Sequence, residues 1–124
     1  MPAILAKKLG MTQIFQEDGS VARVTVLEAG PCPVTAVRTP ERDGYDAVQL
    51  AFGQTKEKHL SKPELGHLQK ADASPMKHLV EFRGEAGELR VGESVTVDSF
   101  QAGVRVKISG ISKGKGFQGT IKRH

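Results

Sequence analysis

The sequence lacks several features that define common protein classes. It has no Trp, one Cys, and no apolar run approaching the roughly 20 residues of a membrane-spanning helix. Cys32, which lies between two prolines and is expected in a turn, cannot form an intrachain disulfide, and a reducing setting fits. No apolar core of a secretory signal follows Lys7 and Lys8. The chain of 124 residues, 38 % of them hydrophobic, is therefore expected to form one globular domain with its own core.

Acidic residues are absent from the C-terminal end of the chain. Residues 1–98 hold 12 of the 18 Lys and Arg and all 14 Asp and Glu, which gives a net charge of −2. Residues 99–124 hold the remaining six Lys and Arg, a net charge of +6. Segregation of positive charge at one end indicates a polyanionic partner, because charge that serves only solubility is spread evenly. A solvated, disordered basic tail is the alternative.

Short apolar runs that alternate with polar residues predict strands through most of the chain. Val48, Leu50 and Phe52 share one side of such a run. Asp18-Gly19, flanked by two apolar runs, predicts a β-hairpin. The expected strands are Ala3–Leu9, Met11–Phe15, Ala22–Leu27, Val34–Arg38, Ala47–Phe52 and Leu79–Arg83, with further strands through Val95 and Val97 and through Val104, Val106 and Ile108.

One segment has the pattern of a helix instead. Ser61 and Glu64 have the spacing of a capping box, in which the two residues satisfy each other's free backbone N–H groups. Leu65 and Leu68 follow at helical spacing. A short helix is therefore predicted near residues 62–71.

The predicted fold class is all-β, mainly β-structure with one short helix, in a small closed or partly open β-barrel. Strands at short spacing with turns between them favour a barrel or a sandwich. The barrel is expected to occupy residues 1–108. Residues 109–124 have four glycines, four Lys or Arg and little apolar periodicity. We expect them to form a glycine-rich, basic, RNA-facing segment.

The glycine-rich segment does not fit the common nucleotide-binding motifs. A P-loop that begins at Gly110 needs Gly at position 115, where this chain has Lys115. A G-x-G-x-x-G pattern does run from Gly114 to Gly119, but no strand–helix–strand unit with a downstream acidic residue frames it. A dinucleotide site is therefore not predicted.

The remaining chemistry-bearing residues show no catalytic or metal-binding pattern. The four histidines contain no i, i+4 pair of a helical zinc site, and His59 and His67 are expected on a solvated or RNA-facing surface. No G-x-S-x-G nucleophile elbow is present, although a triad formed in space stays open at this stage. We predict no enzyme activity, no metal and no cofactor.

The residue types of the basic segment suit RNA. Glycine lets a backbone lie close to a crowded surface, and interleaved Lys and Arg can each contact a phosphate. Phe117 is the one aromatic residue near these cations. It can stack on a base or anchor in the protein core, and the sequence leaves both open.

Several longer motifs carry a family resemblance. They are Ile4–Phe15 (ILAKKLGMTQIF), Glu28–Cys32 (EAGPC), Gly44–Leu50 (GYDAVQL), Lys62–Glu64 with Gly66 and His67, Ser112–Gly119 (SKGKGFQG) and Lys122–His124 (KRH). Together they resemble, over the whole chain, the universal family of ribosomal protein three of the large subunit, in its bacterial form. The most specific stretch is similar to the family signature, in which Gly-Lys-Gly precedes a further Gly and then an Arg.

The resemblance implies a barrel of the translation-protein type that binds large-subunit ribosomal RNA near its 3′ end, early in assembly and close to the peptidyl transferase region. It implies large-subunit ribosomal proteins fourteen and nineteen as neighbours, a cytoplasmic location in the ribosome, and neither a membrane nor a small-molecule substrate. Carried over by motif, the RNA-binding candidates are Lys7, Lys8, Lys113, Gly114, Lys115, Gly116, Phe117, Lys122, Arg123 and His124.

Two features depart from the family pattern. Lys107 stands where the family signature usually has Asp or Asn, which adds a cation. The family also continues past the Lys-Arg-His motif with a glycine-rich basic extension toward the peptidyl transferase centre and with strands that complete the barrel. We therefore expect this chain to be a truncated form.

Two other functions stay open on the sequence alone. A small barrel oxidoreductase would use the glycine-rich segment to hold a phosphate-bearing cofactor. A protein-interaction module of a translation factor would bind through the edges of its sheets, and its binding would be insensitive to salt.

Overall fold

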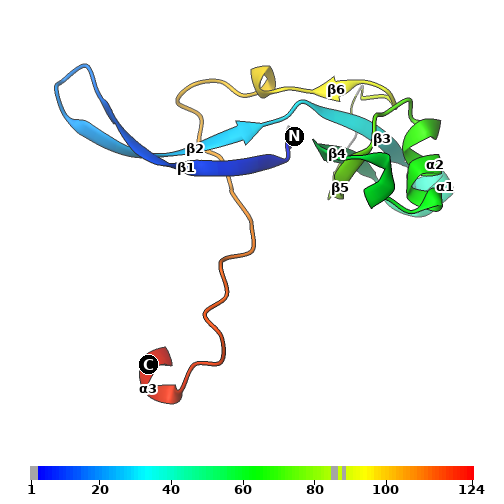
Figure 1. Ribbon diagram of the computed structural model, residues 1–124. Coiled ribbons are helices and arrows are strands. Elements are labelled where there is room, and N and C mark those ends of the chain that lie inside the picture. Colours follow the sequence, from blue (N-terminus) through cyan, green and yellow to red (C-terminus); the bar gives the residue numbers. More distant parts are fainter. Residues whose placement is uncertain (1–2, 85–86, 88) are drawn as a thin grey trace.

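The strands form two antiparallel sheets in a computed structural model that describes residues 3–84, 87 and 89–124 (Figure 1). The elements, in chain order, are β1 (Ala6–Phe15), β2 (Val21–Ala29), β3 (Cys32–Arg38), α1 (Pro40–Asp43), β4 (Ala47–Gln54), η1 (Glu57–His59), α2 (Lys62–Lys70), β5 (Met76–Arg83), β6 (Ser94–Val95), η2 (Val97–Ser99) and α3 (Thr120–Arg123). The predicted mainly-β class with a short helix is confirmed. Within the described residues the two sheets stay separate, so the arrangement is the partly open one rather than a closed barrel.

The first sheet is the hairpin of β1 and β2, which extends from the rest of the body (Figure 1). Its turn is the predicted one, because the N–H of Gly19 donates to Gln16 O at 3.0 Å and Gly19 has a φ of 83°. The two strands expected on either side of Gly10 are a single strand. Between Lys8 and Gly10 the register shifts, so a bulge absorbs the extra residue without ending the strand.

The second sheet has the strand order β5-β4-β3-β6. Apolar side chains lie on both of its faces. On one face Val34, Leu50 and Val95 form a buried cluster with Cys32. Cys32 was expected in a turn, but it begins β3 and its side chain is buried, and this burial raises the pKa of its thiol.

The junction between the two sheets is tight. Gly30 has a φ of 65°, and a Cβ at this position would lie 3.0 Å from Ile4 Cδ1 and 3.1 Å from Val95 O. Its N–H donates to Leu5 O at 3.2 Å. Only glycine fits this backbone conformation and this space, so Gly30 fixes where the hairpin meets the core.

Helix α2 covers the other face of the second sheet. Leu68 is buried against Ala51 and Met76, with Leu60 at the edge of the cluster. The predicted helix is confirmed, and its start is held by Glu64, whose carboxylate accepts a hydrogen bond from the N–H of Ser61 at 3.1 Å. Burying a leucine side chain of this kind contributes about 1.5–3 kcal/mol.

An ionic cluster ties α1 to the strands β3 and β5. Arg38 contacts Glu81 at 3.1 Å and Asp43 at 3.3 Å. The hydroxyl of Tyr45 donates to Glu81 at 2.7 Å, and the guanidinium of Arg83 lies 4.9 Å from the centre of the Tyr45 ring. These polar side chains were not singled out in the sequence, and their role here is to hold the sheet edge.

The strand expected through Val104, Val106 and Ile108 does not form. These residues lie in extended chain outside any described strand, and their side chains are 58 %, 55 % and 70 % exposed. The alternation is present, but no strand among the described residues offers hydrogen-bond partners to this backbone. Strand β6 is likewise shorter than expected, because Val97 begins the turn η2.

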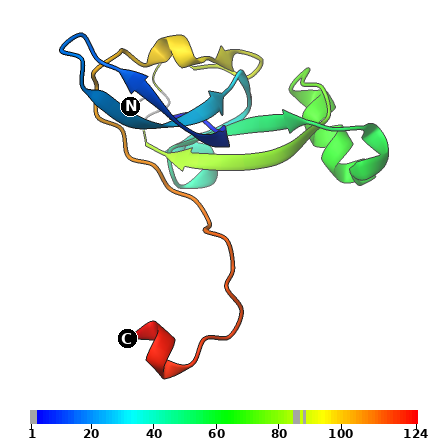
Figure 2. The same ribbon diagram turned by 60° about the vertical axis from the view of Figure 1, so that its left-hand side comes forward.

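The C-terminal part of the chain leaves the body as an extended arm. Residues 101–124, called the tail below, run away from both sheets and end in α3 (Figure 2). Both views show the end of the tail well apart from the strands. Its side chains are therefore available to a partner.

Candidate nucleic-acid interface

The tail is exposed along its length. Every residue in it is exposed except Gln118, which is half-buried. It contains six Lys and Arg, which are all of those in residues 99–124, and it contains no acidic residue. The positive charge predicted from the sequence is thus on a surface that the body does not cover.

No acidic side chain of the described residues neutralises these cations. The two ion pairs found in that part of the chain are both made by Arg38, which belongs to the body. Lys113 and Lys115 are exposed on either side of Gly114. A polyanion therefore meets cations without first breaking an internal salt bridge.

The glycines of the tail have open space around them. A Cβ added to Gly110, Gly114, Gly116 or Gly119 would meet no atom within 4 Å. Packing within the chain therefore does not explain their presence. Gly116 has a φ of 73°, a conformation that other residues adopt with strain, so here the backbone itself uses glycine.

The last predicted RNA-binding residues lie on a short helical turn. Gly119 O accepts hydrogen bonds from the N–H of Lys122 at 3.1 Å and of Arg123 at 3.2 Å. His124 closes the turn through Thr120 O at 3.1 Å. The turn α3 was not predicted, because four residues carry no helical periodicity, and it gathers Lys122, Arg123 and His124 at one end.

Phe117 does not anchor in the core, one of the two positions that the sequence left open. Its side chain is fully exposed, as is that of Ile111. The other aromatic side chain with a large exposed fraction is Phe15 on the hairpin, at 76 %. The ring of Phe117 therefore has no partner in the described part of the protein.

Lys7 and Lys8 lie apart from the other candidates. Both are exposed on β1, and Lys7 is paired in register with Glu28 of β2, which places an acidic residue opposite it. Figures 1 and 2 show α3 far from this strand. The structure thus joins the candidates from Lys113 to His124 in one segment and does not bring Lys7 and Lys8 beside its end.

The expectation for His67 was wrong. Its ring is half-buried on α2, and its Nε2 lies 2.6 Å from Gln49 Oε1, which also accepts a hydrogen bond from the hydroxyl of Thr35 at 2.8 Å. His67 is therefore a packing residue that fixes α2 to the sheet. His59 is exposed, in keeping with a solvated surface.

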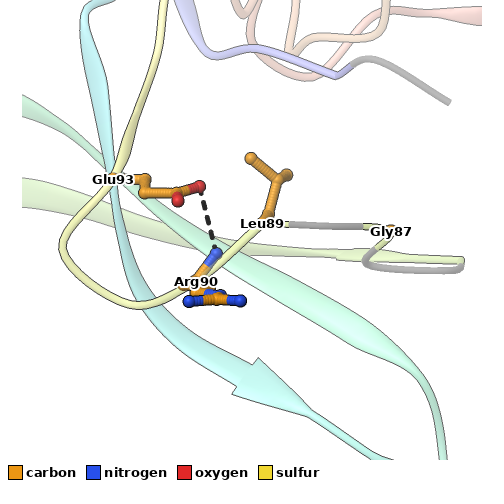
Figure 3. Close-up of a pocket in the computed structure, with 4 residues that line it drawn as sticks. All are labelled: Gly87, Leu89, Arg90 and Glu93. Carbon is orange, nitrogen blue, oxygen red and sulfur yellow. Dashed lines mark hydrogen bonds between the residues drawn. The ribbon is translucent and has the colours of Figure 1, made fainter.

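The described residues that line a hollow of the body show no constellation for catalysis. The hollow is lined by Gly87, Leu89, Arg90 and Glu93, and the carboxylate of Glu93 accepts a hydrogen bond from the N–H of Arg90 at 3.2 Å (Figure 3). The residues that the structure describes also hold no group of His, Cys, Asp and Glu that could bind a metal. In the same residues, no helix has the length and apolar character needed to cross a bilayer.

Comparison with known proteins identifies the relationship. No protein-family model matches the chain. The chain is 53 % identical, over 122 residues, to the large ribosomal subunit protein uL3 of Acidothermus cellulolyticus, and this match covers 98 % of the chain. The chain belongs to the uL3 family.

The match to uL3 covers nearly the whole of this chain but only part of the relative. In all, 702 curated proteins match the chain significantly. The chain spans 55 % of the length of the Acidothermus uL3. The family resemblance of the sequence motifs is confirmed. Because the chain covers only part of the relative, the match alone does not assign the activities of the whole uL3 protein to this chain.

Proposed function

We propose that this chain is a structural, non-enzymatic constituent of the large ribosomal subunit that binds ribosomal RNA through its tail. The observation that carries the proposal is the tail itself, an exposed segment with six cations and no acid, attached to a folded body of slightly negative charge. Membership of the uL3 family supports the ribosome as the assembly that supplies the polyanion.

The mechanism is neutralisation of phosphates combined with a fit of shape. Lys113, Lys115, Lys122 and Arg123 contact phosphates, which fixes the position of the protein without reading a sequence. The glycines between them let the backbone approach the RNA closely. The packed sheet and helix α2 provide the rigid base from which residues 109–124 reach the RNA. Lys7 and Lys8 on β1 supply a second, separate contact to the RNA.

The finer assignments rest on the family resemblance of the motifs. The chain binds near the 3′ end of the large-subunit RNA, joins the subunit early in assembly, and lies near the peptidyl transferase region. Its protein neighbours are large-subunit proteins fourteen and nineteen, and it acts in the cytoplasmic ribosome. No cofactor, membrane or small-molecule substrate takes part.

Reversal of two charges in the tail tests the proposal. The variant with Lys113→Glu and Lys115→Glu is expected to bind a 3′ fragment of large-subunit RNA about tenfold or more weakly near 0.1 M salt, because two phosphate contacts become repulsions. Fluorescence anisotropy of labelled RNA measures the affinity.

The matched control reverses two lysines with the same spacing on the exposed surface of the body, Lys56→Glu with Lys58→Glu. This variant changes the net charge by the same amount, so it separates a site in the tail from a general charge effect. Equal loss in the two variants, or no loss in either, contradicts binding through the tail. RNA affinity that neither variant changes, and that does not depend on salt concentration, supports the protein-interaction module instead.

A further inference from the structure

The tail exposes apolar side chains as well as charge. Ile111 and Phe117 are fully exposed, and Ile121 is 92 % exposed. Neutralising phosphates needs none of these side chains. A partner that matches the tail must therefore offer apolar surface between its negative charges.

Among the exposed apolar side chains of the tail, Phe117 has the surroundings of a stacking residue. It follows Gly116 and lies two residues before Gly119, and a Cβ at either glycine would meet no atom within 4 Å. Because glycine has no side chain, neither of these two neighbours covers the ring of Phe117. Lys115 and Lys122 lie close in the sequence on its two sides, so phosphates held there keep a nucleic-acid chain near the ring.

We infer that Phe117 stacks on an unpaired nucleobase, so that the tail binds single-stranded or looped RNA in preference to a continuous duplex. The inference rests on the proposed function and adds the form of RNA that the site takes. In an A-form duplex the bases are stacked on one another and their faces are hidden, whereas loops and single strands can present them. One polymer then supplies both the charge and the flat apolar surface that the tail requires.

An apolar pocket on a protein partner would also accept a phenylalanine. It fits the tail less well, because the cations on both sides of Phe117 would need acidic groups at matching positions on that partner. Single-stranded RNA has a phosphate at every nucleotide and a base beside it, which matches one aromatic side chain, Phe117, that lies between Lys115 and Lys122 in the sequence.

A tryptophan in place of Phe117 reports stacking directly. The chain has no Trp, so the tryptophan emission of the Phe117→Trp variant, excited at a wavelength that Tyr45 does not absorb, comes from position 117 alone. Titration with an oligouridylate of about 12 nucleotides, within the site sizes of single-strand binders, is expected to quench this fluorescence. A duplex RNA of the same length, bound to the same occupancy by anisotropy, is expected to leave it unchanged. Phe15→Trp, on the exposed hairpin, is the control and should not be quenched by either RNA.

Affinity measurements complete the test. Phe117→Ala is expected to weaken binding of the oligouridylate about tenfold, within the range found for bases stacked on aromatic side chains, and to leave duplex binding unchanged. Phe117→Leu, which keeps apolar volume but has no flat ring, should weaken it to a similar degree. Full affinity in the Leu variant overturns stacking.

The outcomes separate this inference from the proposed function. If tryptophan at position 117 is not quenched while Lys113→Glu with Lys115→Glu still weakens RNA binding as predicted, the tail binds RNA but Phe117 does not stack. If the tryptophan responds only to other ribosomal proteins, with a blue-shifted emission, Phe117 occupies a protein pocket and the inference is wrong. If neither the charge reversals nor the ring substitutions alter RNA binding, the proposed function fails as well.

Discussion

At the scale of single residues, the ionic cluster around Glu81 makes the stability of the body depend on pH. Hydrogen bonds from the Tyr45 hydroxyl and then from Arg38 lower the pKa of the Glu81 carboxyl from its ordinary value of 4.5. The unfolded chain therefore binds the proton more readily than the folded chain. The stabilisation is present above pH 4.5 and is lost as the pH falls through the lower, folded value.

The prediction is that Glu81→Gln removes this part of the pH dependence. The unfolding free energy of the unchanged protein should fall more steeply than that of the variant as the pH decreases below about 4.5. Urea denaturation followed by circular dichroism at a series of pH values measures both curves. Glu57→Gln, on the exposed turn η1, controls for the loss of one negative charge. Parallel curves for the Glu81 variant and the unchanged protein would contradict the prediction.

Single residues also mark where sequence reasoning stops. Polarity alone placed His67 on a solvated surface, yet it bonds to Gln49 in a half-buried contact that joins a helix to a strand. That contact depends on how α2 crosses the sheet, which no local pattern encodes. The charge of Lys113 and Lys115, by contrast, is a property of the sequence itself, and exposure of the tail only makes it usable.

At the scale of elements, two glycines, each within a regular element, should respond in opposite ways to alanine. Gly66 lies inside α2, is exposed, and has no atom within 4 Å of an added Cβ. Gly53 lies in β4 with a φ of 82°, and an added Cβ would lie 3.4 Å from His78 Cδ2. Alanine fits the first conformation and is strained in the second.

Gly66→Ala is expected to raise the unfolding free energy by about 0.5–1 kcal/mol, because alanine favours helix and restricts the unfolded chain. Gly53→Ala is expected to lower it by about 1 kcal/mol or more. Thermal and urea unfolding of the two variants measure the difference. A Gly66→Ala protein that is less stable than the unchanged one would show that α2 needs this glycine for a reason other than helix propensity.

Elements with strong local signals were predictable, and those that need a distant partner were not. The hairpin at Asp18-Gly19 and the helix begun by Ser61 are set by short-range chemistry, and both form as expected. The run from Val104 to Ile108 has the same alternation as a strand, but alternation specifies only which side chains share a face. A strand also needs a neighbour for its backbone, and the described body does not place one there.

At the scale of the whole molecule, the positive charge is concentrated in the tail while the body is slightly negative. This distribution sets how RNA binding responds to salt. The six cations of the tail face no acid in the same segment, whereas the body has slightly more acids than bases. Each phosphate neutralised releases condensed counterions, so the logarithm of the association constant falls in proportion to the logarithm of the salt concentration. Full engagement of six cations predicts a slope of about −4 on single strands and about −5 on a duplex.

Lys107 offers a one-residue test of this distribution. It is exposed in the tail, and Lys107→Asn supplies one of the residue types typical of the family signature while removing one cation. If Lys107 lies on a phosphate, the slope should become shallower by about 0.7 on single-stranded RNA, with a uniform loss of affinity across RNA sequences. Anisotropy titrations between about 0.05 and 0.2 M salt measure the slope. Lys70→Asn, at an exposed position of α2, is the matched control and should leave it unchanged, because Lys70 lies outside the proposed RNA interface. If both variants alter the slope equally, the whole surface of the protein, rather than its tail, contacts the RNA.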